Sequence, residues 1–206
     1  MMRSKTLDKV SDAYARIVDS LLIARDSRSH QRWVITSTRT GDGTTTTALG
    51  IARALAARGI KGLLIDANSR NPSISQGLND PSHPGLLEAI KGEHQASEVC
   101  QEGHAMGNFA VVAVGRKEAE PLELLTNPRI IELLGDFAGH YDVVVVDTPA
   151  LDQGLAALTL APHVDGCVLV VRSAKTGKRA LQKARERIEK AGGKILGTVL
   201  NGSMRC

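Results

Sequence analysis

The chain has 206 residues, a formal net charge of +4 and few aromatic side chains (one Trp, two Tyr and two Phe). This length suits a single domain, predicted over residues 1–206. The scarcity of aromatic rings disfavours nucleic-acid partners, because single-strand binders stack bases on such rings. The three Cys are widely spaced, no apolar run is long enough to span a bilayer, and no signal-peptide core is present. We therefore expect a cytoplasmic domain without disulfides or a transmembrane segment.

An amphipathic helix is predicted over about residues 7–24. Leu7, Val10, Tyr14, Ile17 and Leu21 recur there at spacings of three and four residues. The apolar face of this helix packs either on its own domain, which we favour, or on a partner protein.

A strand–loop–helix unit follows. The apolar residues 33–35 predict a strand, residues 36–47 form a loop that contains Gly41 and Gly43, and residues 48–56 have a helical pattern. This is the layout of a phosphate-binding loop, although Thr44 stands where such a loop carries Lys, while Thr45 keeps the hydroxyl. The alternative is a threonine-capped turn that opens a buried helix.

The rest of the chain alternates strands and helices. Strands are predicted at residues 61–67, 109–114, 141–147, 165–171 and 195–200, and helices at 85–90, 121–125, 127–135, 154–160 and 176–191. Such alternation predicts an α/β fold, a P-loop NTPase-like three-layer α/β/α arrangement around a mostly parallel central sheet. Two of the strands end in Asp66 and Asp147, so two carboxylates converge beside the loop, which suits Mg²⁺.

These motifs resemble the cytoplasmic bacterial tyrosine kinases of capsule and exopolysaccharide export. Those kinases belong with the septum-site and chromosome-partition ATPases of the deviant-Walker-A group. The resemblance covers about residues 11–201 and is carried by residues 34–43, 64–72 (resembling the Walker A′ motif), 85–88, 122–129, 141–149 (resembling Walker B), 165–176 and 196–201.

The resemblance implies binding of ATP or ADP with Mg²⁺. Mg²⁺ would be held by Thr45, Asp66 and Asp147, and Asp66 would also orient the attacking hydroxyl or water. The implied nucleotide-binding residues are Gly41, Asp42, Gly43, Thr44, Thr45 and Thr46 in the loop, with Arg172 and Asn201 near the base, where Asn201 would hydrogen-bond adenine.

The chain departs from the family pattern in several places. Thr44 replaces the loop Lys, and losing such a charge costs about 3 kcal/mol of transition-state stabilisation, by analogy with a lost oxyanion donor. Asn68 replaces the second acid of a D-x-D pattern, and no tyrosine cluster stands at the C-terminus. The family's E-x-x-R-x-x-R pattern, which joins subunits into a ring, reads Asp12, Ala15 and Val18, so we expect a dimer rather than a ring if the chain self-associates.

These features favour a degenerate tyrosine-kinase-like protein with impaired or absent phosphoryl transfer. The resemblance implies that it regulates a membrane polysaccharide co-polymerase, a chain-length regulator, at the inner face of the membrane. An alternative is an active autokinase or ATPase in which Arg39, or a partner's residue, replaces the missing Lys. A third interpretation, a partition or septum-type positioning ATPase, ranks last.

Overall fold

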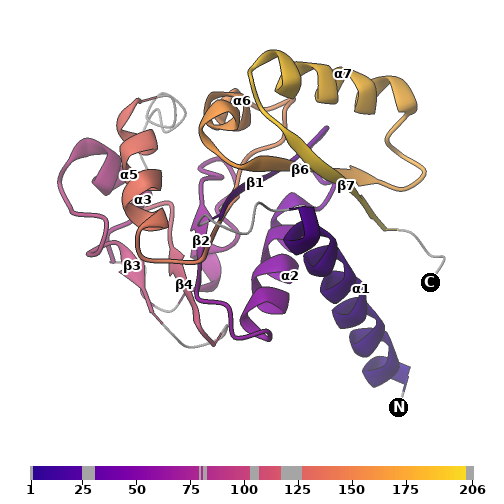
Figure 1. Ribbon diagram of the computed structural model, residues 1–206, viewed down its shortest axis with the longest axis horizontal. Coiled ribbons are helices and arrows are strands. Elements are labelled where there is room, and N and C mark those ends of the chain that lie inside the picture. Colours follow the sequence, from indigo (N-terminus) through magenta and orange to yellow (C-terminus); the bar gives the residue numbers. More distant parts are fainter. Residues whose placement is uncertain are drawn as a thin grey trace.

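The computed structural model describes residues 2–24, with side chains from Val10 onward, and residues 31–78, 80, 83–102, 107–116 and 127–202. Its centre is a seven-stranded sheet in the order β3-β4-β2-β5-β1-β6-β7 (Figure 1). The strands are β1 (Gln31–Ser37), β2 (Gly62–Asp66), β3 (Cys100–Gln101), β4 (Phe109–Val112), β5 (Val143–Asp147), β6 (Gly166–Arg172) and β7 (Ile195–Asn201). Every neighbouring pair is parallel except β3 with β4. The mostly parallel sheet expected from the sequence is confirmed.

Helices cover both faces of this sheet. They are α1 (Met2–Ala24), α2 (Thr44–Ala56), α3 (Leu86–Lys91), α5 (Arg129–Ala138), α6 (Ala156–Leu160) and α7 (Lys178–Lys190), with short 3₁₀ turns η1 (Ser75–Gly77) and η2 (Ala161–His163). The helix predicted at 121–125 lies outside the described residues. Helix α1 begins earlier than residue 7, and α2 begins within the threonine run.

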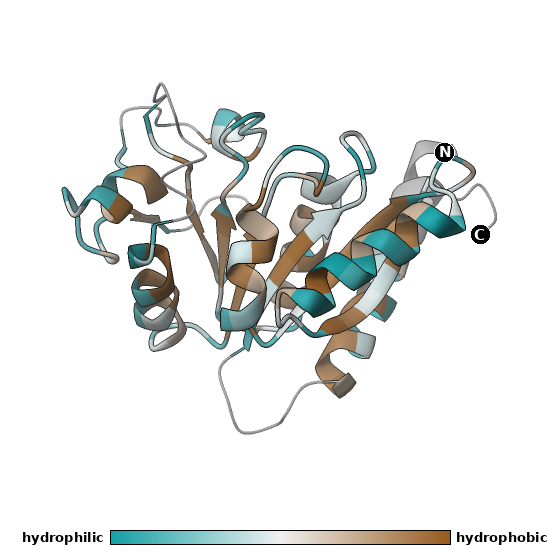
Figure 2. Cartoon of the chain, turned by 90° about the horizontal axis from the view of Figure 1, so that it is seen from above, coloured by the Kyte–Doolittle hydropathy of each residue, from teal (hydrophilic) through white to brown (hydrophobic). Residues whose placement is uncertain are grey.

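Alternating side chains divide the core into two clusters. Trp33 and Ile35 of β1 pack with α1 and α2, whereas Val34 packs with α3, α5, α6 and α7. Because successive strand residues point to opposite faces, one buried strand supplies both clusters. The result is the three-layer α/β/α fold expected from the sequence, with apolar strands between helices (Figure 2).

Helix α1 packs on α2 in the same chain. Val18 and Leu21 are buried there, and the ring of Tyr14 lies over Gly50, where an added Cβ would stand 2.4 Å from the ring. Val18 occupies the third position of the ring-forming pattern and is 0 % exposed, so that position packs within the chain.

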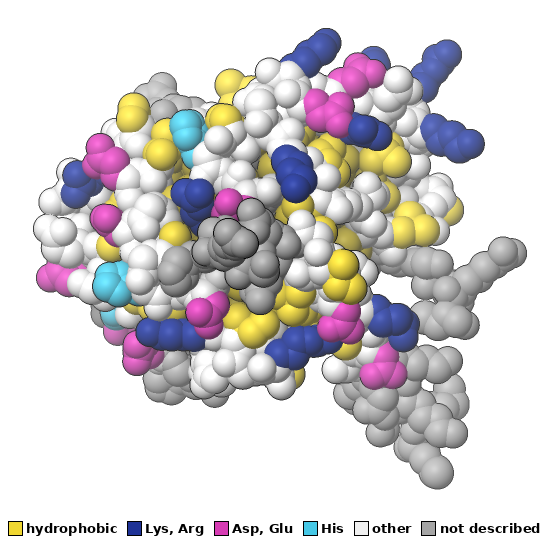
Figure 3. Space-filling view, viewed as in Figure 1, with side chains coloured by type: hydrophobic (Ala, Val, Ile, Leu, Met, Phe, Trp, Pro, Cys, Tyr) yellow, Lys and Arg dark blue, Asp and Glu magenta, His cyan; other side chains and the backbone are white. Residues whose placement is uncertain are grey.

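Helix α7 presents a basic outer face. Its buried residues are Ala184 and Ile188, and its exposed face carries Lys178, Arg179, Lys183, Arg185, Arg187 and Lys190. Lys and Arg side chains are visible over this helix in Figure 3. Glu186 and Glu189 lie among them, and Arg185 pairs with Glu189, as on an ordinary solvated helix face.

Parallel pairing brings the functional strand ends together. In the sheet register Asp66 at the end of β2 lies opposite Asp147 at the end of β5. Strand β5 also pairs with β1, whose carboxyl end leads into the glycine loop. The loop and both carboxylates therefore share one edge of the sheet, where open α/β sheets bind ligands.

Candidate functional site: a phosphate loop beside two buried carboxylates

The loop between β1 and α2 is shaped from within by Asp42. Its buried carboxylate accepts hydrogen bonds from the Thr38 hydroxyl (2.6 Å) and the Arg39 amide (3.1 Å). Gly43 has a φ of 97°, and an added Cβ would stand 1.9 Å from the Asn201 amide nitrogen. Only glycine fits this left-handed, crowded position. The structure therefore places Asp42 as a loop-shaping residue whose carboxylate faces the loop itself.

The loop opens onto a hollow of about 350 Å³. Helix α2 starts directly after Gly43 without a side-chain cap, and the first amides of a helix have no partner within it. Those amides and the positive end of the helix dipole favour an anion. Residues of this loop and of the turn after β2 line the hollow, with two from the segment after β5: Thr40, Gly41, Gly43, Thr44, Thr45, Thr46, Asn68, Arg70, Asn71, Ser73, Ala150 and Gln153.

Thr44 and Thr45 have different partners. The Thr44 hydroxyl donates to the Ser37 hydroxyl (2.7 Å), which ties the start of α2 to the end of β1. The Thr45 hydroxyl donates to Oδ2 of Asp147 (2.6 Å). Position 44 thus contributes a structural hydrogen bond in place of a charge, while position 45 joins the loop to the carboxylate of β5.

Asp147 has one carboxylate oxygen without a partner. Its Oδ1 atom is buried and makes no hydrogen bond within the described part of the chain. Burial is the main cause that raises the pKa of Asp147 to about 8; the Thr45 hydrogen bond opposes this rise, and the nearby Asp66 charge adds to it. An orphaned carboxylate oxygen beside a hydroxyl fits Mg²⁺, which prefers oxygen ligands and keeps several waters. Because the described residues hold no cluster of three or more Asp, Glu, His or Cys, phosphate and water would complete the coordination.

Asp66 is held by protein donors. One carboxylate oxygen accepts the Asn68 amide (3.0 Å), and the other accepts the amide (3.0 Å) and hydroxyl (2.8 Å) of Ser75 in η1. Burial raises the pKa of Asp66, and these hydrogen bonds oppose the rise. Asp66 therefore neighbours Asp147 as predicted, but its carboxylate is engaged by Ser75, a residue that the sequence analysis did not identify.

Arg172 and Asn201 both contact the loop backbone. Arg172 Nη1 donates to the Gly41 carbonyl (3.0 Å), and Asn201 Nδ2 donates to the Asp42 carbonyl (2.9 Å). The ends of β6 and β7 thus hold the loop carbonyls. The contact of Asn201 with adenine stays a prediction.

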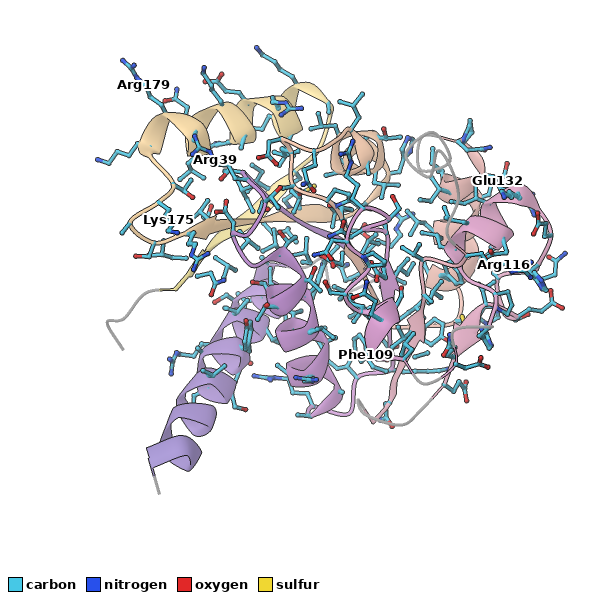
Figure 4. The ribbon with its side chains drawn as sticks, turned by 180° about the vertical axis from the view of Figure 1, so that it is seen from behind. Arg39, Phe109, Arg116, Glu132, Lys175 and Arg179 are labelled. Carbon is cyan, nitrogen blue, oxygen red and sulfur yellow. The ribbon has the colours of Figure 1, made fainter. Side chains whose placement is uncertain are left out.

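Arg39 lies outside the lining of the hollow. Its side chain is exposed and extends from the loop on the side of α7 (Figure 4). Arg70, which the sequence analysis quoted only as part of a motif, lines the hollow instead. Its place four residues after Asp66, in the turn that follows this Asp-terminated strand, was the signal that could have identified it.

Comparison with known proteins gives the chain's relationships. A family model described as an AAA domain matches residues 31–194. The tyrosine-protein kinase YwqD of Bacillus subtilis is 32 % identical over 205 residues, covering 98 % of this chain and 84 % of YwqD. The chain belongs to the bacterial tyrosine kinase family.

Solved structures agree with membership of the bacterial tyrosine kinase family. The kinase domain of the Escherichia coli tyrosine kinase ETK is 28 % identical, with a TM-score of 0.88 over 95 % of this chain and 77 % of that one. The septum-site protein MinD of Pyrococcus horikoshii, solved with Mg-ADP, is 23 % identical with a TM-score of 0.71, covering 85 % of this chain and 72 % of that one. At that identity MinD shows the shared fold alone. The resemblance read from the sequence is confirmed.

No helix among the described residues of this family member has both the length and the apolar character needed to cross a bilayer.

Proposed function

We propose that this kinase-family chain binds Mg-ATP or Mg-ADP in the hollow but transfers the phosphoryl group poorly. The observation that carries the proposal is the contrast between Thr45 and Thr44. Thr45 and Asp147 form a pair of candidate Mg²⁺ ligands, and Oδ1 of Asp147 has no hydrogen-bond partner among the described residues. Thr44, in contrast, supplies no charge to the phosphates. Phosphoryl transfer depends on charge stabilisation and positioning, so turnover suffers more than binding.

Calorimetric titration with Mg-ADP and Mg-ATP tests the binding half of this proposal. Wild type is compared with Thr44→Lys, which restores the loop cation at a half-buried position. We expect wild type to bind, and Thr44→Lys to bind about tenfold or more tightly, because a charge-assisted hydrogen bond contributes about 1.5–3 kcal/mol. No heat of binding from folded wild type would contradict the proposal.

We also propose that the chain works as a cytoplasmic regulatory partner of a membrane polysaccharide co-polymerase. The resemblance supports this role, and so does the outer surface of α1, where Val10 (49 %) and Ile23 (85 %) are exposed. The test is fractionation of cells with and without the co-polymerase. The proposal expects membrane association only in its presence, and weaker association after Ile23→Ser. Equal membrane association in both strains would contradict it.

Self-association is part of the same proposal, as a dimer rather than a ring. Light scattering in Mg-ATP tests it, and a ring-sized species would contradict it.

A second candidate is an active autokinase or ATPase. The pair of candidate Mg²⁺ ligands, Thr45 and Asp147, favours this activity, because that part of the site is intact. In this alternative a partner's residue, or Arg39 acting across a dimer, supplies the missing charge. It predicts a rate of hydrolysis per protein molecule that rises with protein concentration and is lost in Arg39→Ala. The primary proposal predicts slow turnover in both wild type and Arg39→Ala.

A further inference from the structure

One cation faces the hollow. Among the described residues that line it, Arg70 alone carries a positive charge. Its guanidinium is exposed and makes no hydrogen bond or ion pair within the part of the chain that the structure describes. The other lining side chains are Thr, Asn, Ser, Ala, Gly and Gln, so this charge is not neutralised by any of them.

A hydrogen-bonded turn fixes the backbone that carries Arg70. The Asn71 amide donates to both the backbone carbonyl (3.1 Å) and the side-chain oxygen (3.3 Å) of Asn68. The Asn68 amide in turn donates to Asp66, and the Ser73 amide donates to the Asn71 carbonyl (2.8 Å). The turn is therefore anchored to the end of β2. Asn68 shapes the turn through the backbone and side-chain oxygens that accept the Asn71 amide.

We propose that Arg70 is the cation that binds the terminal phosphates of a nucleoside di- or triphosphate in this chain, taking over the charge that position 44 lacks. The inference rests on the proposed nucleotide binding and names the group that supplies its affinity. A guanidinium suits this task, because its planar set of donors matches phosphate oxygens in pairs. The charge comes from the turn after β2 and not from the loop, so it supports binding without restoring the loop geometry of an efficient kinase.

The experiment compares Mg-ATP affinity in wild type, Arg70→Gln, Arg70→Lys and Arg179→Gln. Arg179 is a matched control, since it is an exposed arginine that projects from α7, away from the hollow (Figure 4). Arg70→Gln is expected to bind Mg-ATP about tenfold or more weakly, with Arg70→Lys in between and Arg179→Gln like wild type. Equal affinities for Arg70→Gln and Arg179→Gln, with wild type binding, would overturn the inference alone. No binding by wild type would overturn the proposed function, and the inference with it.

A double-mutant cycle separates charge from structure. If Arg70 and a lysine at position 44 serve the same phosphates, Thr44→Lys gains more affinity in the Arg70→Gln background than in wild type. A purely structural role for Arg70 gives equal gains in both backgrounds, and that result would also overturn the inference.

Discussion

The protonation of Asp147 makes the stability of the protein depend on pH in a distinctive direction. Burial raises the pKa of this carboxyl from 3.8 to about 8. The native state therefore keeps a proton that the unfolded chain releases, and the free energy of unfolding falls as pH rises between these two values. A shift of about four units corresponds to a difference on the order of 5 kcal/mol across that window.

Asp147→Asn removes this dependence, because the amide resembles the protonated acid in shape and carries no charge. Chemical unfolding of both proteins without divalent metal, at about pH 5 and about pH 8, measures the effect. We expect similar stabilities at the lower pH, and a variant more stable than wild type by a few kcal/mol at the higher pH. The buried Asp66 contributes a slope of the same sign to both proteins. Because the Asp66 charge also raises the Asp147 pKa, the difference between the two profiles measures Asp147 together with its coupling to Asp66. Parallel pH profiles for the two proteins would refute the reasoning.

Two further predictions concern packing around the site. Gly50→Ala pushes a methyl group against the Tyr14 ring, so we expect a loss of about 1–3 kcal/mol in urea unfolding; in a Tyr14→Ala background the same change gains about 1 kcal/mol from helix propensity. Equal effects in both backgrounds would contradict the packing of α1 on α2. Ser75→Ala removes a hydroxyl that donates to Asp66 and accepts the Val114 amide, so it should cost about 1–3 kcal/mol in the same assay. A Ser75→Ala protein as stable as wild type would show that neither bond matters.

The sheet and its functional edge could be predicted because their signals are local. Val143 to Val146 form an apolar run that is buried on both faces, and such a run indicates a central parallel strand. This strand ends at Asp147, and β2 ends at Asp66, so both strands place a carboxylate at the edge of the sheet where the parallel strands have their carboxyl ends. Strand β3 could not be predicted, because it has two residues and exists only through antiparallel pairing with β4.

The contacts within the site depend on tertiary structure and could not be predicted from the sequence. Ser75 donates to Asp66 from the short 3₁₀ turn η1, and no hydrophobic periodicity in the sequence identifies Ser75 as a site residue. The sequence suggests Arg39 as a replacement for the missing Lys, whereas the position of the turn after β2 brings Arg70 into the lining of the hollow. The absence of a charge at Thr44 is visible in the sequence, whereas its hydrogen bond to Ser37 follows only from the folded loop.

The central claim is a nucleotide site that binds but transfers poorly. Its most direct test is the rate of γ-phosphate release and of tyrosine phosphorylation at saturating Mg-ATP, measured for wild type and Thr44→Lys with Asp147→Asn as the inactive reference. We expect wild-type turnover close to the reference and a Thr44→Lys rate about 100-fold higher, which corresponds to a recovered transition-state stabilisation of about 3 kcal/mol. Wild-type turnover equal to that of Thr44→Lys, and far above the reference, would contradict it.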